Sequence, residues 1–271
     1  CLKSILDQDY ENFELIIVDD GSSDNSLEIL NEYEAINAKI RVFSQKNQGV
    51  ASALNKALNH AKGKYCCFMA SDDTLIQGKI KTQVEFLETN PKFQVVSGNY
   101  KKVNEKSELI GEQIKHNQNK EILGDVFSGC LFHILTAMFS LRSIREVGGF
   151  RDGVDCEDWY LQIMLSKAGV RFFHIDQYFA LYRMHDQSTH LQIESTIRKK
   201  NKLAKFFLDE ERFKIEKAAI QHGLHLLAGH FSVLRYLIFS SRNIIQIIKY
   251  NVIYLFVKYL IFMIFKKAKE I

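Results

Sequence analysis

Near the start of the chain, an apolar run leads directly into two aspartates and a glycine. Residues 13–18 form an almost continuous apolar segment, which is typical of a strand covered on both faces. Asp19 and Asp20 stand where the chain leaves this strand, and Gly21 permits a tight turn. Aspartate and glycine also favour turns that have no function. A strand that ends in carboxylates and then enters a helix nevertheless predicts a ligand site at the carboxyl end of a parallel strand.

The pattern of a strand followed by a helix recurs up to about residue 97. Asn25 and Glu28 have the spacing of a capping box for a helix over 26–36, and Gly63 is the expected C-cap of a later helix. The other predicted elements are strands over 40–44, 65–69 and 93–97, helices over 50–61 and 79–88, and short strands near 100–110 and 135–141. Three strand–helix repeats predict an α/β fold with parallel strands.

The composition is that of a globular protein. Of the 271 residues, 46% are hydrophobic, which supplies the core of one large domain or of one domain with an appendage. Five cysteines, without a Cys-x-x-Cys pair, argue against a zinc site or a disulfide framework and predict a reducing, cytoplasmic location. The chain opens at Cys1 in a helical spacing and without an initiator methionine, so the first strand of the fold is expected to be missing.

Asp72 and Asp73 form a second carboxylate pair, at the end of the strand expected over 65–69. The carboxyl ends of parallel strands share one edge of a sheet, so we expect this pair and Asp19–Asp20 to face one crevice. Oxygen ligands of this kind favour Mg²⁺ or Mn²⁺, and such a cation is commonly bound together with substrate phosphates. The two pairs therefore predict a metal-assisted phosphate site.

A third acidic pair follows the glycine turn at 148–150. Glu157 and Asp158 stand at the start of a helix expected over 159–167, where negative charge is favourable in any case. Simple stabilisation of the helix and a catalytic role both remain open for this pair.

Taken together, these segments resemble the family 2 glycosyltransferases, which use nucleotide-sugar donors and have the GT-A fold. The matching motifs are, in chain order, Val18 to Asp24, Asn47 to Ala51, Gly63 to Tyr65, Ser71 to Asp73, Gly148 to Phe150, Glu157 to Trp159 and Tyr182 to His185. The resemblance implies a catalytic domain over 1–190, with a mixed, mainly parallel sheet and flanking helices. A helical region over 191–271 would follow it.

The resemblance also implies roles on the donor side of the site. Asp20 would contact the nucleotide base, with Asp19 beside it, and a UDP-sugar is the expected donor. Asp72 would face the ribose or the metal, and Asp73 is the better candidate for metal contact, although the two can exchange roles. The family has an acidic residue where Ala70 stands, so one carboxylate on the metal side is absent here.

The transfer reaction explains why such residues are needed. An acceptor hydroxyl attacks the anomeric carbon of the sugar and expels a nucleoside diphosphate, and a divalent cation at Asp72 and Asp73 stabilises the charge on the leaving oxygen. Asp158 matches the general base of the family, a role typically worth about 10²–10⁴ in rate. One base opposite the leaving group predicts inversion of the anomeric centre.

The remaining site residues flank these carboxylates. Arg183 is expected to bind the donor diphosphate through its charged fork, and His185 is expected at the phosphate or the metal, with a surface-loop histidine as the alternative. Glu157 and Trp159 are expected on the acceptor side. The Trp159 ring, or that of the neighbouring Tyr160, would stack on a sugar, and one of the two must pack inward.

The end of the chain carries most of the positive charge. Residues 233–271 contain seven basic residues and one acidic residue, a net +6, whereas the whole chain is +4. Arg235, Arg242 and Lys249 are seven apart and share one face of an otherwise apolar helix. The following apolar run, of about 14 residues, is shorter than the roughly 20 needed to span a bilayer. We expect peripheral docking on an anionic membrane, with packing on the catalytic domain or on a second subunit as the alternative.

Two functions of other classes are rivals. A dinucleotide-binding oxidoreductase should show a Gly-x-Gly-x-x-Gly run after a strand, and the sequence has none. A noncatalytic nucleotide-sugar or glycan-binding module is compatible with Ala70.

Nucleic acid is not an expected partner, because the basic residues gather in an apolar tail. The expected acceptor is a lipid-linked or cell-envelope glycan.

Overall fold

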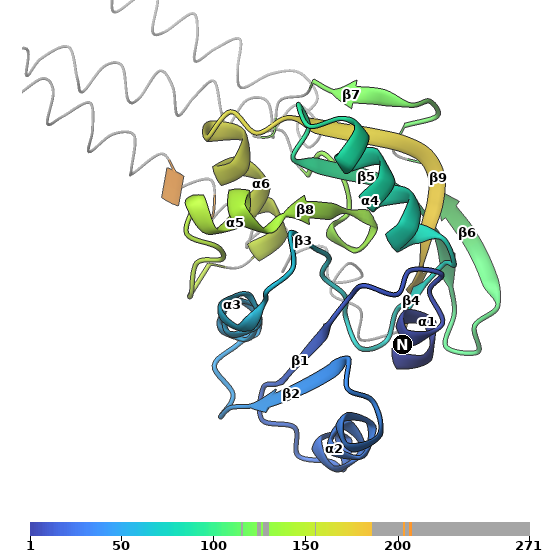
Figure 1. Ribbon diagram of the computed structural model, residues 1–271, viewed down its shortest axis with the longest axis vertical. Helices are drawn as coiled ribbons and strands as arrows, with labels where there is room; N and C mark the ends of the chain where they lie inside the picture. The colour runs from blue at the N-terminus through green and yellow to red at the C-terminus, as the bar shows by residue number, and fades with distance from the viewer. Residues whose placement is uncertain are drawn as a thin grey trace, which may run out of the picture. The chain divides into compact units, whose positions relative to one another are not determined.

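The computed structural model describes residues 1–114, 116–123, 126, 130–154, 156–185, 203, 206 and 207 (Figure 1). The chain divides into two compact units, Cys1–Leu203 and Ala204–Ile271. The expected helical region over 191–271 lies outside the described residues, apart from residues 203, 206 and 207, and the basic tail over 233–271 lies wholly outside them. The helices and strands with described bounds are all in the first unit.

Strands and helices alternate in the first part of the chain much as expected. The helices are α1 (Leu2–Leu6), α2 (Ser26–Ile36), α3 (Val50–His60), α4 (Lys79–Thr89), α5 (Leu141–Glu146) and α6 (Glu157–Lys167), with a 3-10 turn η2 (Ile134–Thr136). The strands are β1 (Leu15–Asp19), β2 (Ile40–Ser44), β3 (Tyr65–Cys66), β4 (Thr74–Leu75), β5 (Val95–Val103), β6 (Leu109–Gln113), β7 (Lys120–Ile122), β8 (Met138–Ser140) and β9 (Phe172–Arg183). The predicted helix over 26–36 and the predicted strand over 40–44 are confirmed. The strand expected over 65–69 shortens to β3, and that expected over 93–97 lengthens to β5.

The strands form two sheets. β1 and β2 make a parallel pair of their own, and the other seven form a mixed sheet in the order β3-β8-β5-β9-β4, with β6 on β5 and β7 on β9. β5 and β9 are parallel, whereas β3, β4, β6, β7 and β8 pair antiparallel. The α/β fold with a mixed sheet and flanking helices is confirmed. The expectation that β3 continues a parallel sheet from β1 is wrong, because β3 pairs antiparallel with β8.

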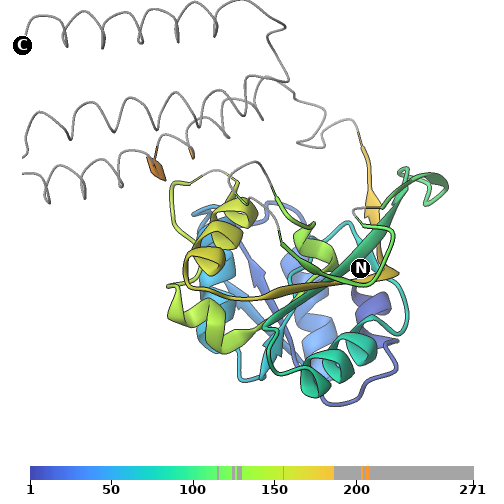
Figure 2. The same cartoon turned by 90° about the horizontal axis from the view of Figure 1, so that it is seen from above.

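Apolar residues cover both faces of the larger sheet. Neighbouring residues in a strand point to opposite faces, so Val95 of β5 joins one core with α5 and α6, whereas Val96 joins another with α4. Figure 2 shows α4 and α6 on opposite sides of β9. Trp159, Leu161 and Leu165 of α6 are each at most 2% exposed. This two-sided burial fixes the ends of β4, β5 and β9, which carry much of the candidate site.

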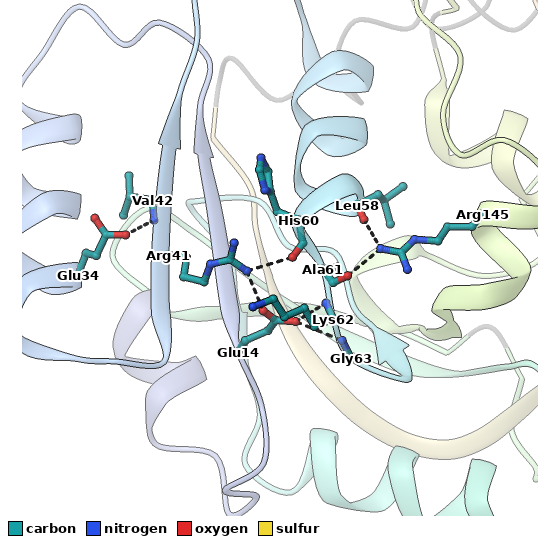
Figure 3. A network of polar contacts seen from close by, with 10 residues as sticks. All are labelled: Glu14, Glu34, Arg41, Val42, Leu58, His60, Ala61, Lys62, Gly63 and Arg145. Atoms are coloured by element: carbon teal, nitrogen blue, oxygen red, sulfur yellow. Dashed lines mark hydrogen bonds and ion pairs between the residues drawn. The ribbon is translucent and has the colours of Figure 1, made fainter.

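A polar network joins the β1–β2 pair to α3 and α5 (Figure 3). Glu14 accepts hydrogen bonds from Arg41 Nη1 at 3.2 Å, from the Lys62 amide at 2.6 Å and from the Gly63 amide at 3.2 Å. Arg145 of α5 donates to the carbonyls at the C-terminal end of α3, those of Leu58 and Ala61, at 2.7 Å each. The carbonyls at a helix end lack intrahelical hydrogen bonds, and Arg145 donates hydrogen bonds to them here.

Of the two predicted helix caps, the one at Gly63 is wrong, and the one at Asn25 has the expected position but lacks its side-chain hydrogen bond. Gly63 does not cap α3, which ends at its C-cap residue Ala61 in an extended conformation; the Gly63 amide is held instead by Glu14. At the start of α2, Asn25 makes no side-chain cap bond, and Asp24 Oδ1 accepts the Ser26 amide at 3.0 Å. The helices begin and end close to the expected residues because other polar groups satisfy their ends.

Candidate active site

Asp19 stabilises the turn at the end of β1. Its side chain is 6% exposed and accepts hydrogen bonds from the amides of Gly21 and Ser22 at 3.3 Å each, and from the Ser44 hydroxyl at 3.4 Å. Gly21 has φ +83°, and a Cβ there would lie 2.8 Å from the Asn47 amide nitrogen. The turn therefore requires glycine. In this structure Asp19 supports the turn, and its expected donor contact stays a prediction.

Asp20 holds the loop between β2 and α3. Oδ1 accepts from Gln45 Nε2 at 2.8 Å and from the Gln48 amide at 2.9 Å, and Oδ2 accepts from the Gly49 amide at 2.8 Å. The hydrogen bond from Gln45, followed by those from the two amides, lowers the pKa of Asp20, so it is ionised at neutral pH. A carboxylate has about four acceptor positions, so Asp20 can still accept from a bound base.

Four expected site residues come together where β4 and β9 meet. Asp72 Oδ2 lies 3.3 Å from His185 Nε2, and both side chains are about one-third exposed. Asp73 Oδ1 accepts the Arg183 amide at 2.9 Å. β4 pairs antiparallel with β9, with Thr74 opposite Leu181, and this register brings the residues before β4 beside the end of β9. Sequence positions more than 100 residues apart are thus adjacent.

Asp73 is the most deeply buried of these carboxylates. It is 2% exposed, and burial raises its pKa to about 6 despite the hydrogen bond from the Arg183 amide. Asp72, whose side chain is 38% exposed, is the member of the pair that faces His185. The expectation that Asp73 is the better metal candidate therefore differs from the geometry, in which Asp72 and His185 form the accessible pair.

An aromatic cluster, of which only Tyr182 belongs to a predicted motif, lies beside Asp73. The His133 ring is 4.8 Å from that of Tyr100 and 5.1 Å from that of Tyr182, between centroids. Burial, followed by the charge of Asp73, raises the pKa of Tyr182 to about 12. His133 Nδ1 accepts the Leu135 amide at 3.3 Å, so the neutral ring carries its proton on Nε2. Only strand pairing reveals this cluster, because its members come from β5, β9 and the start of η2.

Asp158 lies in the first turn of α6, with two hydrogen bonds from its own surroundings. Oδ1 accepts the Trp159 amide at 2.7 Å, and Oδ2 accepts the Cys130 thiol at 3.7 Å. Cys156, the residue before the helix, has a left-handed conformation with φ 66°, which bends the chain into α6. Cys130 was not expected near the base, since nothing in its sequence surroundings points to Asp158.

The turn before α6 is held by α3. Asn55 Nδ2 donates to the Phe150 carbonyl at 2.7 Å, and its Oδ1 accepts the Phe150 amide at 2.9 Å. Gly149 has φ +71°, and a Cβ there would lie 2.7 Å from Asn55 Oδ1. The glycines of the 148–150 motif thus permit a close approach to α3 that helps to position the start of α6.

Trp159 belongs to the core. Its side chain is 2% exposed, and its indole nitrogen donates to the Val126 carbonyl at 2.6 Å. Tyr160 is also buried, at 7% exposed. The expectation that either ring stacks on an acceptor is therefore not met in this structure, because both of these side chains pack inward. Glu157 is half-buried in the first turn of α6, and its expected contact with the acceptor stays a prediction.

Among the described residues, the hydrogen bonds of the aspartates in the three acidic motifs lead to different partners. Asp19 and Asp20 accept hydrogen bonds from the β1 turn and the 45–49 loop. Asp72 and Asp73 contact the end of β9, and Asp158 contacts Cys130 and Trp159. Their meeting in one crevice stays a prediction. Within the described part of the chain, no three His, Cys, Asp or Glu side chains are grouped to hold a metal ion.

The Arg183 guanidinium has partners within the chain. It donates to the carbonyls of Asp72, Asn104 and Glu105 and to the Ser107 hydroxyl. Its expected contact with a donor diphosphate stays a prediction.

No helix in the described residues is both long and apolar enough to cross a membrane. The tail expected to dock on a membrane lies outside those residues.

The sequence of this chain is similar to those of known glycosyltransferases. Residues 1–147 match the model of glycosyl transferase family 2. The putative teichuronic acid biosynthesis glycosyltransferase TuaG of Bacillus subtilis is 29% identical over 188 residues, which cover 68% of this chain and 73% of that protein. An uncharacterized glycosyltransferase of Rickettsia felis is 33% identical over 59% of this chain and 27% of its own. The hyaluronan synthase of Pasteurella multocida is 30% identical over 74% of this chain and 20% of its own. This chain spans about a quarter of the length of the rickettsial relatives that it matches.

Solved structures share the fold. Staphylococcus aureus TarS 1–349, crystallised with UDP-GlcNAc, superposes with a TM-score of 0.59 at 20% identity, over 69% of this chain and 54% of that one. The mannosyltransferase PcManGT of Pyrobaculum calidifontis, in complex with GDP-Man and Mn²⁺, gives a TM-score of 0.54 at 18% identity, over 70% of this chain and 54% of its own.

Proposed function

Because this chain belongs to glycosyl transferase family 2, we propose that it moves a sugar from a nucleoside-diphosphate donor to an acceptor hydroxyl, with inversion of the anomeric centre. The observation that carries the proposal is the pair of Asp72 and His185, with Oδ2 and Nε2 3.3 Å apart. Asp73, beside this pair, accepts a hydrogen bond from the Arg183 amide. These residues come from two distant motifs of the family pattern, and the β4–β9 pairing brings them to one place.

On the donor side, Asp20 is suited to the nucleotide base. It is ionised and fixed by three hydrogen bonds, so an N–H group of the base would meet an oriented acceptor. Uracil offers such a group at N3, so the arrangement is compatible with the UDP-sugar expected from the resemblance. Solved neighbours with related folds carry UDP-GlcNAc or GDP-Man, which supports a nucleotide-sugar donor without selecting the base.

The chemistry of the donor set fits a divalent cation. Asp72 supplies a carboxylate oxygen and His185 an imidazole nitrogen, both partly exposed, and Mg²⁺ or Mn²⁺ is typically held by one or two side chains together with substrate phosphates. When bound, the cation supplies Lewis-acid stabilisation of the leaving diphosphate. Ala70 contributes no ligand through its side chain, so the diphosphate has a larger share of the coordination.

On the acceptor side, Asp158 is the proposed general base. Its Oδ1 is occupied by the Trp159 amide, whereas Oδ2, as far as the described residues show, accepts from the weak donor Cys130 at 3.7 Å. Oδ2 is therefore the oxygen that takes the proton of the acceptor hydroxyl as the new glycosidic bond forms. Glu157, on the same turn of α6, is the proposed acceptor-binding residue.

The names of two relatives support the proposed acceptor class. TuaG is named for teichuronic acid biosynthesis and the Pasteurella protein as a hyaluronan synthase, so both names refer to polysaccharides. We place this protein in cell-envelope glycan or polysaccharide synthesis, acting on a glycan or lipid-linked acceptor. The basic tail over 233–271 would hold it on the cytoplasmic face of the membrane.

The test is a panel of UDP-, GDP- and dTDP-sugars, each with and without Mn²⁺, followed by calorimetry and by release of nucleoside diphosphate. We expect one nucleotide class to bind, with binding strengthened by Mn²⁺ and weakened in Asp72→Asn. Asp152→Asn is the matched control, since Asp152 is an exposed carboxylate remote in sequence from β4 and β9. Metal-enhanced binding without release of diphosphate to any acceptor or to water would instead favour the noncatalytic module.

A further inference from the structure

Arg183 makes contacts with the metal-side turn through both its backbone and its side chain. Its amide donates to Asp73 Oδ1 at 2.9 Å, and its Nε donates to the Asp72 carbonyl at 2.9 Å. Both partners immediately precede β4. Arg183 therefore binds the turn that carries Asp72 at two separate points.

These two bonds extend the pairing of β4 with β9. Thr74 is opposite Leu181, and continuing this antiparallel register places Asp72 opposite Arg183. β4 has only two residues, so its ladder alone is short. The bonds of Arg183 continue the pairing up to the position where Asp72 and His185 face one another.

The two terminal nitrogens of the guanidinium, Nη1 and Nη2, donate hydrogen bonds to a third segment, the turn between β5 and β6. Nη1 donates to the carbonyls of Asn104 at 2.8 Å and Glu105 at 2.9 Å, and Nη2 donates to the Ser107 hydroxyl at 3.1 Å. With the bond from Nε, four of the five N–H donors of an arginine are occupied. Few N–H groups are left to bind a diphosphate. The expected contact between the Arg183 guanidinium and phosphate therefore does not fit this structure.

We propose that Arg183 is a positioning residue that sets the spacing of Asp72 and His185, and that it does not bind the donor diphosphate. The inference rests on the proposed function, in which that pair holds the divalent cation. His185 follows Arg183 by two residues, and Asp72 is bonded to Arg183 through its carbonyl. A change at Arg183 therefore moves both ligands, even though the guanidinium touches neither of their metal-binding atoms.

The two roles make different demands on the side chain. Phosphate binding needs positive charge, which lysine keeps. The positioning role needs a planar fork that reaches three segments, and lysine lacks this geometry. Arg183→Lys and Arg183→Ala should thus be equally harmful if Arg183 positions the ligands, whereas lysine should rescue alanine if Arg183 binds phosphate.

The experiment measures Mn²⁺ binding to the full chain by the electron paramagnetic resonance signal of free Mn²⁺, first without nucleotide and then with UDP. We expect both Arg183 variants to bind Mn²⁺ about ten- to a hundredfold more weakly than the wild type, the loss typical of residues that orient metal ligands. Arg171→Ala is the matched control, because Arg171 adjoins the other end of β9 and pairs with Glu121 at 2.7 Å. Its Mn²⁺ affinity should be unchanged.

Unchanged Mn²⁺ affinity in the two Arg183 variants would overturn the inference, and so would a lysine variant that binds Mn²⁺ or UDP clearly better than the alanine variant. A wild-type protein that binds no Mn²⁺, with or without UDP, would refute the metal site itself and the inference with it. If circular dichroism shows that the Arg183 variants do not fold, Mn²⁺ binding by the Ser107→Ala variant tests the inference instead. It removes one contact at an exposed turn and should weaken Mn²⁺ binding about two- to tenfold, the range for one hydrogen bond; unchanged affinity would count against the inference.

Discussion

Replacing Asp73 with asparagine is expected to stabilise the protein at neutral and alkaline pH. The Asp73 side chain is 2% exposed, and burial raises its pKa from the ordinary 3.8 to about 6. Above that pH the folded protein contains a buried carboxylate ion, which is costly. Asparagine has no charge to bury, and its Oδ1 can still accept the hydrogen bond from the Arg183 amide.

The magnitude follows from proton linkage. Between about pH 4 and pH 6 the folded state binds more protons than the unfolded state, so wild-type stability falls as the pH rises through this window. A rise in pKa from 3.8 to about 6 corresponds to about 3 kcal/mol at 1.36 kcal/mol per unit. The free energy of unfolding of Asp73→Asn, relative to wild type, should therefore increase by up to about 3 kcal/mol from below pH 4 to above pH 7.

Urea denaturation over this pH range measures the difference directly. EDTA is included, because a bound cation would stabilise the charged form of Asp73 and oppose the effect of burial. Asp152→Asn, at an exposed carboxylate, is the control and should follow the wild type at every pH. If the wild-type and Asp73→Asn curves run parallel across the whole range, the reasoning from burial is refuted.

Three further substitutions test how the site is built. Asp20→Asn should destabilise the protein by about 1–3 kcal/mol in urea melts, because an amide cannot accept all three hydrogen bonds that Asp20 receives; an unchanged midpoint would contradict its role in holding the loop. Asn55→Ala should cost a similar amount, since it leaves the Phe150 amide and carbonyl without their partner, whereas a neutral result would mean that the turn is held elsewhere. Gly98→Ala should cost about 1–3 kcal/mol or more, because its Cβ would lie 2.4 Å from the Phe179 ring and 2.7 Å from the Gln177 carbonyl; a wild-type melting temperature would show that β9 yields easily.

Elements with a clear period were predictable from the sequence. α2 and β2 have the expected bounds, and α4 lies within a residue of them, because apolar spacing and turn residues act locally. The pairing of β3 was not predictable. It depends on β8, more than 70 residues further along the chain, and a two-residue strand has no pattern of its own.

The site shows the same division between local and distant causes. The motifs located Asp72, Asp73, Arg183 and His185, and the structure brings them together. The motifs could not show that Asp73 is buried while Asp72 is exposed, because consecutive residues look alike in sequence and differ only in the direction of their side chains. The burial of Trp159 against the Val126 carbonyl has the same origin, since the partner lies 33 residues earlier in the chain.

The contacts of Arg183 illustrate a further limit. The sequence analysis predicted that Arg183 binds phosphate, because the charge of a side chain is visible in a sequence and its contacts are not. Four of its donors are instead occupied by backbone carbonyls and a hydroxyl, which no charge pattern reveals. Uncharged partners of this kind become visible only once the β5–β6 turn and the end of β9 are placed in space.

Donor turnover by Asp158→Asn is the most direct test of the central claim. Release of nucleoside diphosphate is compared between this variant and the wild type, with the same nucleotide-sugar, Mn²⁺ and either acceptor or water. Removing a general base should lower the rate by about 10²–10⁴. Calorimetry should show unchanged donor binding, since the Asp158 carboxylate accepts its hydrogen bonds from Cys130 and Trp159. A variant that turns over the donor at a near-normal rate would contradict the assignment of Asp158 and the inverting mechanism built on it.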